Sequence, residues 1–244
     1  MWATLARPDR ANALGPEIVE ALSGWLRAAE EDASISALVI TGEGAAFCPG
    51  ADVKASLEMA QEPDRRAAFF AEARDLLGRL SSAPVPVIAA VNGVAYAGGL
   101  ELALACDFII AAQSATFGDL HLAHGRIPAW GSSARLLNAL GPWRSSRFLL
   151  DSAPVSAEEL RGLGVVALVV DDDNLVQAVD EIVGGWAGYQ PGPLRAMKAL
   201  IAEQRAHSVQ PLLDVEAAHF ERFLASGNMG DFRHDLAREG RDRC

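Results

Sequence analysis

The sequence contains few cysteines, few lysines and no long apolar run, and each deficit argues against a class of function. Its three cysteines, Cys48, Cys106 and Cys244, are far apart and form no CxxC pair, which predicts neither a disulfide framework nor a zinc site. Lys54 and Lys198 are its only lysines, and the net charge is -11, so no nucleic-acid partner is expected. No apolar segment approaches the length of a membrane span. We therefore expect no metal, no nucleic acid and no membrane contact.

The first residues also lack the pattern that directs secretion. The segment MWATLARPDRANAL has no basic region followed by a long apolar stretch, and it has no small-residue cleavage site. Together with the odd number of cysteines, this predicts a protein of the reducing cytoplasm. A chain of 244 residues, with 50% hydrophobic and 22% charged residues, can bury the core of one main domain.

Segments with helical and strand-like patterns alternate through the first half of the chain. Residues 15–31 and 63–80 place apolar side chains at helical spacing. Residues 37–41, 87–93 and 107–112 are short apolar runs typical of buried strands, and the first two lead into glycine-bearing loops. This alternation predicts an α/β fold with helices packed on a mostly parallel sheet.

Beyond Gly131 the pattern becomes mainly helical. Ser156 is followed three residues later by Glu159, which forms a capping box, and the helix that it starts should end at Gly164. Two amphipathic helical segments with little strand potential then follow from residue 192. We therefore divide the chain into an α/β core, residues 1–190, and a helical C-terminal portion, residues 191–244.

Two adjacent glycines, Gly98 and Gly99, stand at the predicted start of a helix in the segment NGVAYAGGLELALACD. Free N–H groups at a helix start attract negative charge, and glycine allows a ligand to approach the backbone closely. A second donor could come from the loop 49–52, since loops that follow parallel strands meet at one sheet edge. The two loops together could form an oxyanion hole. Either loop alone is also explained as a tight turn that needs glycine for steric reasons.

Glu101 follows Gly98 by three residues, so on a helix it lies about one turn along the same face. A glutamate in the first turn of a helix is also a common way to stabilise the helix dipole. However, the residues around it are apolar and leave no solvent-exposed face, and a buried carboxylate is costly without a partner or a role. These properties make Glu101 a candidate catalytic carboxylate.

Several segments resemble the signature segments of the enoyl-CoA hydratase/isomerase, or crotonase, superfamily. They are AFCPGADV (46–53), NGVAYAGGLELALACD (92–107) and FGDLHLAHGRIPAWGSSARL (117–136), while RPDRANAL near the start is similar to the first turn of the family. The matches occur in the order and spacing of the family and span most of the chain. The resemblance implies a crotonase-like spiral of ββα units and an acyl-CoA thioester substrate. It also implies a homotrimer or dimer of trimers, with residues 191–244 as the trimerisation region.

The same resemblance assigns roles to individual residues. The backbone N–H groups of Ala51 and Gly98 would bind the thioester oxygen, and Glu101 would hold or activate the water that adds to the β-carbon. Coenzyme A is then part of the substrate, and no separate cofactor is expected. The remaining predicted substrate contacts are Gly50, Asp52, Lys54, Gly99 and Trp130. Two of these side chains have an equally good structural explanation. Lys54 is explained as a plain surface residue, and Trp130 as a residue of ordinary packing.

His121 stands where the family's hydratases carry their second glutamate. Histidine transfers protons near neutral pH, so a pair of Glu101 and His121 could still add water, with His121 delivering the α-proton. Alternatively, His121 is a polar residue that is hydrogen-bonded to Asp119 or Glu101 in an enzyme with different chemistry. Asp119 and His124 are near enough in the sequence to join the same pocket.

Enoyl-CoA hydration is the function that this set of residues favours. Isomerisation, decarboxylation or hydrolysis of an acyl-CoA could use the same enolate. A catalytically silent acyl-CoA-binding protein is the alternative from a different class, although Ala51, Gly98 and Glu101 argue against it. A serine hydrolase is disfavoured because no GxSxG segment is present, and a dinucleotide-binding oxidoreductase because residues 97–99 form no GxGxxG motif.

Overall fold

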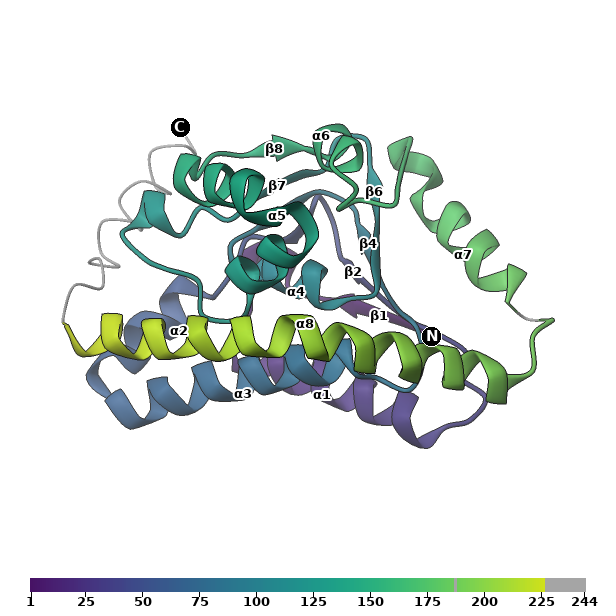
Figure 1. Ribbon diagram of the computed structural model, residues 1–244, viewed down its shortest axis with the longest axis horizontal. Coiled ribbons are helices and arrows are strands. Elements are labelled where there is room, and N and C mark those ends of the chain that lie inside the picture. The colour runs from purple at the N-terminus through teal and green to yellow at the C-terminus, as the bar shows by residue number, and fades with distance from the viewer. Residues whose placement is uncertain (187, 227–244) are drawn as a thin grey trace.

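Two β-sheets form the centre of the structure, a computed structural model that describes residues 1–186 and 188–226 (Figure 1). The larger sheet is entirely parallel, with the strand order β1-β2-β4-β6-β9. Its strands are β1 (Trp2–Leu5), β2 (Leu38–Gly42), β4 (Val87–Val91), β6 (Phe108–Ala112) and β9 (Leu168–Val170). The predicted apolar runs 37–41, 87–93 and 107–112 therefore correspond to β2, β4 and β6.

A smaller sheet has the strand order β3-β5-β7-β8, in which only β8 is antiparallel to its neighbour. Its strands are β3 (Ala46–Cys48), β5 (Val94–Tyr96), β7 (Thr116–Gly118) and β8 (Val155–Ser156). Each of the first three directly follows a strand of the larger sheet and precedes a helix along the chain. The chain thus repeats a strand-strand-helix unit, which confirms the predicted spiral of ββα units.

The helices cover both sheets and extend into a long C-terminal segment (Figure 1). They are α1 (Pro16–Glu31), α2 (Val53–Glu58), α3 (Pro63–Ser81), α4 (Gly98–Ala105), α5 (Ser132–Asp151), α6 (Ala157–Gly162), α7 (Leu175–Gly185) and α8 (Pro191–Ala225). Short 3₁₀ helices occur at Pro8–Arg10, Met59–Gln61, Leu122–His124 and Asp172–Asn174. Among the described residues, no helix combines the length and the apolar character needed to cross a bilayer.

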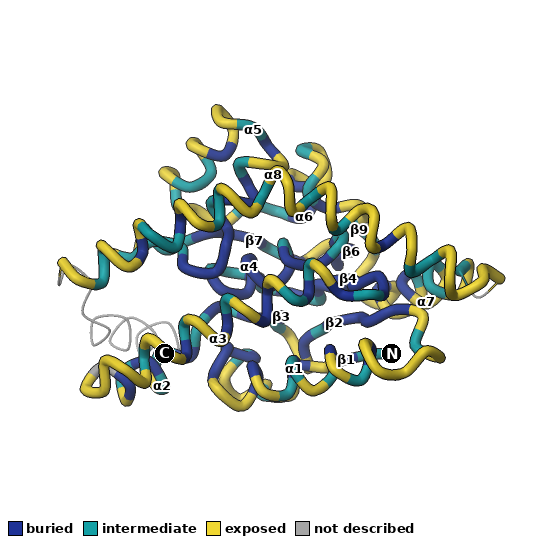
Figure 2. The backbone as a smooth tube through the Cα atoms, turned by 60° about the horizontal axis from the view of Figure 1, so that its bottom comes forward, coloured by how far each residue is buried: buried dark blue, intermediate teal, exposed yellow. Residues whose placement is uncertain are grey.

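The core lies between the larger sheet and the helices that cover it, as the buried strands in Figure 2 show. All five residues of β4 are fully buried, as expected for a parallel strand that is covered on both faces. In α1, the predicted apolar positions Ile18, Leu22 and Leu26 are buried, whereas Trp25 is only partly buried. The helical spacing in the sequence therefore identified the core-facing side of α1.

The short strands β3 and β5 lie in segments that the sequence predicts as loops or turns. A strand of three residues offers too few positions for a period of two to be recognised. Its identity is decided by pairing with the neighbouring strand, here between Ala46 and Val94 and between Cys48 and Ala95. In the C-terminal portion, the two predicted amphipathic segments belong to one continuous helix, α8, which contains Pro211.

The predicted capping box at the start of α6 is present. The Ser156 hydroxyl accepts a hydrogen bond from the Glu159 N–H at 3.2 Å, and the Glu159 carboxylate accepts one from the Ser156 N–H at 2.8 Å. The Ser156 N–H and the Ser156 hydroxyl, which both donate to the Glu159 carboxylate, lower the pKa of Glu159 below its ordinary value. After the helix, Gly164 has a φ of +79°, which is the left-handed conformation that commonly ends a helix.

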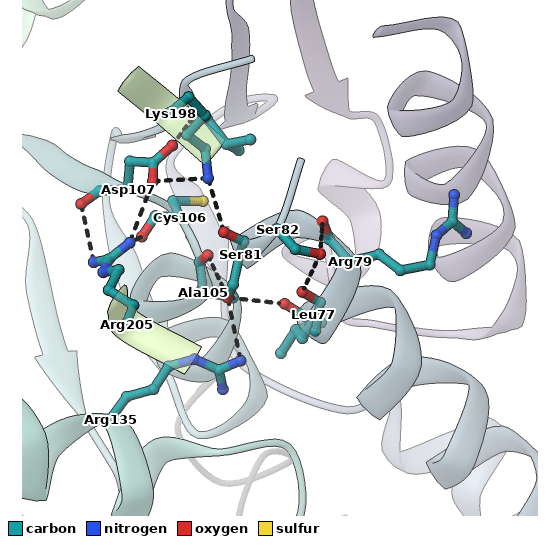
Figure 3. A network of polar contacts seen from close by, with 12 residues as sticks. Leu77, Arg79, Ser81, Ser82, Ala105, Cys106, Asp107, Arg135, Lys198 and Arg205 are labelled. Atoms are coloured by element: carbon teal, nitrogen blue, oxygen red, sulfur yellow. Dashed lines mark hydrogen bonds and ion pairs between the residues drawn. The ribbon is translucent and has the colours of Figure 1, made fainter. Parts of the chain in front are cut away.

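Helix α8 is attached to the rest of the molecule through a polar network around Asp107 (Figure 3). The Lys198 ammonium donates a hydrogen bond to the carbonyl oxygen of Ser81 at 2.7 Å and forms an ion pair with Asp107 at 3.1 Å. Arg205 contacts the same carboxylate at 3.2 Å. The other Asp107 oxygen accepts the N–H of Val87 at the start of β4, so these contacts fix α8 to one end of the larger sheet.

Most of α8 is nevertheless exposed (Figure 2). The helix begins at Pro191, next to the predicted boundary of the C-terminal portion. Its assignment to a trimerisation region stays a prediction, and residues 227–244 lie outside the described residues.

Helix α4 approaches β3 so closely that only glycine can occupy position 99. A methyl group on Gly99 would lie 2.0 Å from the backbone oxygen of Cys48, which is far inside van der Waals contact. Because that oxygen belongs to the backbone of a buried strand, it cannot move aside without displacing β3. The close approach of α4 to β3 therefore depends on the absence of a side chain at Gly99.

We predict that Gly99→Ala destabilises the protein by about 2 kcal/mol or more, because overpacking against the backbone must shift α4 or β3. The free energy of unfolding in urea measures this change. The matched control is Gly24→Ala, an exposed position in α1 where a methyl group meets nothing within 4 Å. There the change should stabilise the protein by about 0.5 to 1 kcal/mol. Equal stability of the two variants would contradict the assignment.

Candidate active site

The backbone N–H of Ala51 is oriented by a short parallel bridge. The Leu14 N–H donates to the Gly50 oxygen at 2.8 Å, and the Leu14 oxygen accepts the N–H of Asp52 at 2.9 Å. In a parallel bridge, these two bonds flank the central residue, whose own N–H points to the opposite side. The N–H of Ala51 therefore points away from Leu14.

The N–H of Gly98 lies close to that of Ala51, because β3 and β5 are parallel neighbours. A methyl group on Gly98 would lie 3.4 Å from the Ala51 nitrogen, and one on Gly50 would lie 3.3 Å from the Gly98 nitrogen. Among residues 1–186 and 188–226, no acceptor is found for either N–H. The predicted convergence of the two loops is therefore present, although they follow strands of the smaller sheet rather than β2 and β4.

The backbone around these donors is held in unusual conformations. Ala97 has a φ of +46° and a ψ of -116°, which is costly for a residue with a side chain. It is fixed there by a hydrogen bond from its N–H to the Gly118 oxygen at 2.8 Å and by one from the Glu101 N–H to its own oxygen at 3.0 Å. Gly50, on the facing loop, has a φ of +118°. Strain of this kind is typical of sites where the backbone itself acts on a ligand.

Glu101 is buried on α4, and its two carboxylate oxygens have different surroundings. Its side chain is 1% exposed. Oε1 accepts hydrogen bonds from the N–H groups of Trp130 at 2.7 Å and Ser132 at 3.2 Å. Oε2 has no hydrogen-bond partner among the described residues and lies 3.7 Å from Nε2 of His121. One oxygen is thus used to fix the carboxylate, while the other faces the imidazole and remains able to bind a further donor.

His121 lies between two carboxylates at the end of β7. Its Nδ1 forms an ion-pair contact of 3.0 Å with Oδ2 of Asp119, and its Nε2 faces Glu101. The same Asp119 oxygen accepts a hydrogen bond from the Ser132 hydroxyl. Both carboxylates that the sequence named as possible partners of His121 therefore lie beside its ring, although neither Nδ1 of His121 nor Oε2 of Glu101 has a hydrogen bond among the described residues. A catalytic role of His121 stays a prediction.

Burial and neighbouring charges shift the pKa values of Glu101, His121 and Asp119. Burial raises the pKa of Glu101 to about 7, since the opposing effect of His121 does not compensate for it. Burial alone would lower the pKa of His121, but Asp119, Glu101 and Glu216 together raise it. Burial would also raise the pKa of Asp119, yet His121 and the Ser132 hydroxyl lower it. The pKa of Glu101 therefore lies near neutrality, whereas the lowered pKa of Asp119 favours its ionised form.

The Trp130 ring packs directly against the backbone at Gly98. A methyl group on Gly98 would lie 2.5 Å from Cζ3 of Trp130. The ring centroid of Trp130 lies 5.9 Å from that of Phe69 and 5.6 Å from that of Phe70, and Phe70 contacts Phe220 of α8 at 5.0 Å. Trp130 thus packs an aromatic cluster from α3 and α8 against the start of α4.

Glu216 is a residue of this region that the sequence analysis missed. It extends from α8 and accepts hydrogen bonds from the N–H groups of Ser133 at 2.9 Å and Ala134 at 3.3 Å, and from the Ser133 hydroxyl. Glu216 thereby caps the start of α5, the helix that carries Ser132. It comes from a helix distant in sequence, so no local motif could indicate this contact. Phe220 was missed for the same reason.

Asp52 and Lys54 have mainly structural surroundings. The Asp52 carboxylate caps α2 by accepting the N–H groups of Lys54 at 2.9 Å and Ala55 at 3.1 Å, and it forms an ion pair with Arg7 at 2.9 Å. Lys54 is exposed beside a groove of about 470 Å³ that Arg7 and Arg10 also line. Substrate contacts by Gly50, Asp52, Lys54, Gly99 and Trp130 stay predictions. Among the described residues, no cluster of side chains is suited to hold a metal ion.

Comparisons with known proteins agree on one family. A family model described as enoyl-CoA hydratase/isomerase matches residues 1–234. A probable enoyl-CoA hydratase of Bacillus subtilis (strain 168) is 33% identical over 212 residues, which cover 86% of this chain and 81% of the relative. The 2,3-dehydroadipyl-CoA hydratase of Escherichia coli (strain K12) is 33% identical over 223 residues, which cover 91% of this chain and 86% of the relative.

Solved structures show the same similarity. The crystal structure of an enoyl-CoA hydratase/isomerase from Xanthobacter autotrophicus Py2 matches with a TM-score of 0.84 at 33% sequence identity. The match covers 94% of this chain and 84% of that chain. The resemblance of the signature segments therefore extends to the whole arrangement of helices and strands.

We predict that Glu101→Gln stabilises the protein relative to wild type as the pH rises. The pKa of Glu101 is raised from 4.5 to about 7, so the folded protein holds this proton more tightly than the unfolded chain does. Ionisation of Glu101 therefore lowers stability progressively between these values, with the full penalty present above them. Glutamine cannot ionise, yet its carbonyl can still accept the two backbone N–H groups.

Unfolding in urea at a series of pH values measures this effect. Between about pH 5 and about pH 8, the Gln variant should gain on the order of 1 to 3 kcal/mol over wild type. The control is Glu20→Gln, at an exposed position on α1, which should show no such trend. A stability difference that does not change with pH would contradict the raised pKa.

Proposed function

The chain belongs to the enoyl-CoA hydratase/isomerase family, and we propose that it adds water across the double bond of a 2-enoyl-CoA. The observation that supports this proposal is the free oxygen of a buried carboxylate, Glu101 Oε2, on the helix that begins with one of two converging N–H groups. The carboxylate can act on a water molecule while the N–H groups bind the thioester. No separate cofactor is needed, since coenzyme A is part of the substrate.

The two backbone donors would stabilise the charge that develops on the thioester. When water adds to the β-carbon, the electrons of the double bond move onto the carbonyl oxygen and form an enolate. The N–H groups of Ala51 and Gly98 would bind this oxygen, and removal of one such donor from the oxyanion hole of another enzyme costs roughly 3 to 4 kcal/mol. Because the donors belong to a fixed backbone, little reorganisation is needed as the charge forms.

Glu101 and His121 would carry the two proton transfers. Glu101 accepts a proton from water as the oxygen bonds to the β-carbon, and the His121 imidazolium gives a proton to the α-carbon as the enolate collapses. The product has gained one water, while Glu101 is left protonated and His121 neutral. Oε2 of Glu101 and Nε2 of His121 are only 3.7 Å apart, so a small approach would let the proton return and restore the starting state.

Isomerisation is a second candidate, and a specific observation favours it. His121 occupies the position of the second hydratase glutamate, so only one carboxylate faces the reaction centre directly. A single base that removes a proton from one carbon of the acyl group and returns it to another moves the double bond without adding water. Both reactions pass through the same enolate, and they differ in whether water is held between Glu101 and His121.

We also propose an assembly and a cellular location, which exposed apolar residues and buried thiols support. Helix α8 exposes Met197, Leu200, Ile201 and Val215, which lie 56%, 48%, 42% and 58% exposed. Apolar groups of this size on one long helix favour association with further copies, as a homotrimer or a dimer of trimers. The buried free thiols of Cys48 and Cys106 are consistent with a protein of the cytoplasm.

The hydration is tested by incubating the protein with a short, a long and a branched 2-enoyl-CoA. We expect loss of the enoyl thioester absorbance and a product heavier by one water. Glu101→Gln should lower kcat roughly a hundredfold or more, because general base catalysis is lost while the fold is kept. His121→Ala should also lower kcat, and unchanged turnover would remove His121 from the mechanism.

The same assay distinguishes the alternatives. Conversion of a 3-enoyl-CoA to the 2-enoyl isomer without water gain would assign the protein as an isomerase. Release of carbon dioxide or of free coenzyme A would indicate decarboxylation or hydrolysis. Tight binding of thioesters without turnover, and with no effect of Glu101→Gln, would indicate a binding protein.

The oligomeric state is tested by light scattering coupled to gel filtration. We expect a particle of three or six times the mass of one chain. Leu200→Glu combined with Ile201→Glu should reduce this mass, because two charges would enter the apolar face of α8. A monomeric wild-type protein would contradict the proposed assembly.

A further inference from the structure

We propose that Asp119 is a positioning residue that keeps His121 doubly protonated and directs its Nε2 toward Glu101. Ser132 acts with it by holding the Asp119 carboxylate in place. This proposal rests on the proposed function, because it describes how His121 becomes able to donate a proton. It concerns two residues that do not reach the substrate themselves and that act through the imidazole.

The first observation is the position of the Asp119 carboxylate. Its side chain is 2% exposed, and Oδ2 lies 3.0 Å from Nδ1 of His121. A carboxylate at Nδ1 favours a proton on that nitrogen, so a further proton on Nε2 makes an imidazolium ion. Nδ1 lies at ion-pair distance from Asp119, and on the other side of the ring Nε2 lies 3.7 Å from Oε2 of Glu101.

The second observation is that Ser132 contacts both carboxylates. Its hydroxyl donates a hydrogen bond to Oδ2 of Asp119, and its backbone N–H donates one to Oε1 of Glu101 at 3.2 Å. Ser132 is fully buried at the first position of α5. The start of this helix therefore sets the spacing of the two carboxylates between which the imidazole lies.

The third observation is the charge around His121. Glu101 faces it from α4, Asp119 from the end of β7 and Glu216 from α8, and all three raise its pKa against the effect of burial. The cations nearby are Arg135 of α5, which interacts with Glu101, and Arg126, whose backbone N–H donates to the His121 oxygen at 2.8 Å.

Asp119 makes the largest contribution to the charged form of His121 among these groups, through both its contact and its charge. It can do so across the neutral range because its own pKa is lowered. Without this carboxylate, burial would favour the neutral imidazole, which cannot supply the α-proton from Nε2 once Nδ1 holds the only proton. Asp119 thus determines the pH up to which His121 serves as an acid.

The test compares Asp119→Asn with wild type in two measurements. The first follows the ring nitrogens of ¹⁵N-labelled histidine by NMR without substrate, with the His121 signal assigned from His121→Gln. We expect the titration of His121 to shift downward by about one pH unit or more, because one adjacent negative charge is removed. This readout does not depend on any reaction.

The second measurement is the pH dependence of turnover with a 2-enoyl-CoA. For Asp119→Asn, the alkaline limb of kcat/KM should move to lower pH by the same amount, and kcat near pH 8 should fall by roughly tenfold or more with little change in KM. Asp119→Glu should restore part of the loss. Ser132→Ala, which keeps both the charge and the backbone N–H, should shift the limb in the same direction by a smaller amount.

Asp75→Asn, at an exposed position on α3, serves as the matched control and should leave both measurements unchanged. An unshifted His121 titration in both Asp119→Asn and Ser132→Ala would overturn the proposal, whatever the enzyme does. If wild type shows no turnover while the titration shifts as expected, the positioning role holds and the proposed hydration fails. If wild type hydrates its substrate and neither variant alters the pH profile, the positioning role fails alone.

Discussion

Burial of the Glu101 carboxylate is the constraint on which the architecture around the candidate site depends. A carboxylate that is 1% exposed needs hydrogen-bond donors, and it obtains them from two backbone N–H groups of the segment that leads into α5. That requirement fixes the start of α5 against α4. In turn, α4 can lie where it does only because Gly99 lets it approach β3, and the same approach brings Gly98 next to Ala51. The close approach of α4 to β3 therefore explains both the packing of the core here and the proximity of the two N–H groups of the candidate site.

Hydrogen bonds connect the residues that bind Glu101 to the C-terminal helix α8. Trp130, whose N–H binds Glu101, has its carbonyl oxygen held by Arg135 at 2.7 Å, and Arg135 also approaches the Ser81 hydroxyl at 3.5 Å. Lys198 of α8 binds the backbone oxygen of the same serine (Figure 3). Glu216 forms a second link, since it caps the start of α5 from α8. Helix α8 thus braces the candidate site although it is largely exposed.

The sequence predicted those structural features that depend on short stretches of consecutive residues. The apolar runs of β2, β4 and β6, the helix start at Gly98, and the burial of Glu101 could be inferred because each depends on a few consecutive residues. The strands β3 and β5 could not, since three residues carry no period and their pairing is a tertiary property. The contacts of Ser132 and of Glu216 were also out of reach, because each joins segments far apart in the chain.

The presence of histidine at position 121 is explained by the carboxylates that surround it. Glu101, Asp119 and Glu216 already place three buried carboxylates around the imidazole. A glutamate at position 121 would add a fourth negative charge at the place where Nδ1 of His121 now lies 3.0 Å from Asp119, and like charges at that distance cannot both stay ionised. With His121 present, the same Asp119 stabilises a cation instead of repelling an anion. The substitution that breaks the two-glutamate pattern is therefore electrostatically matched to its neighbour, which favours a proton-carrying imidazole over a passive polar side chain.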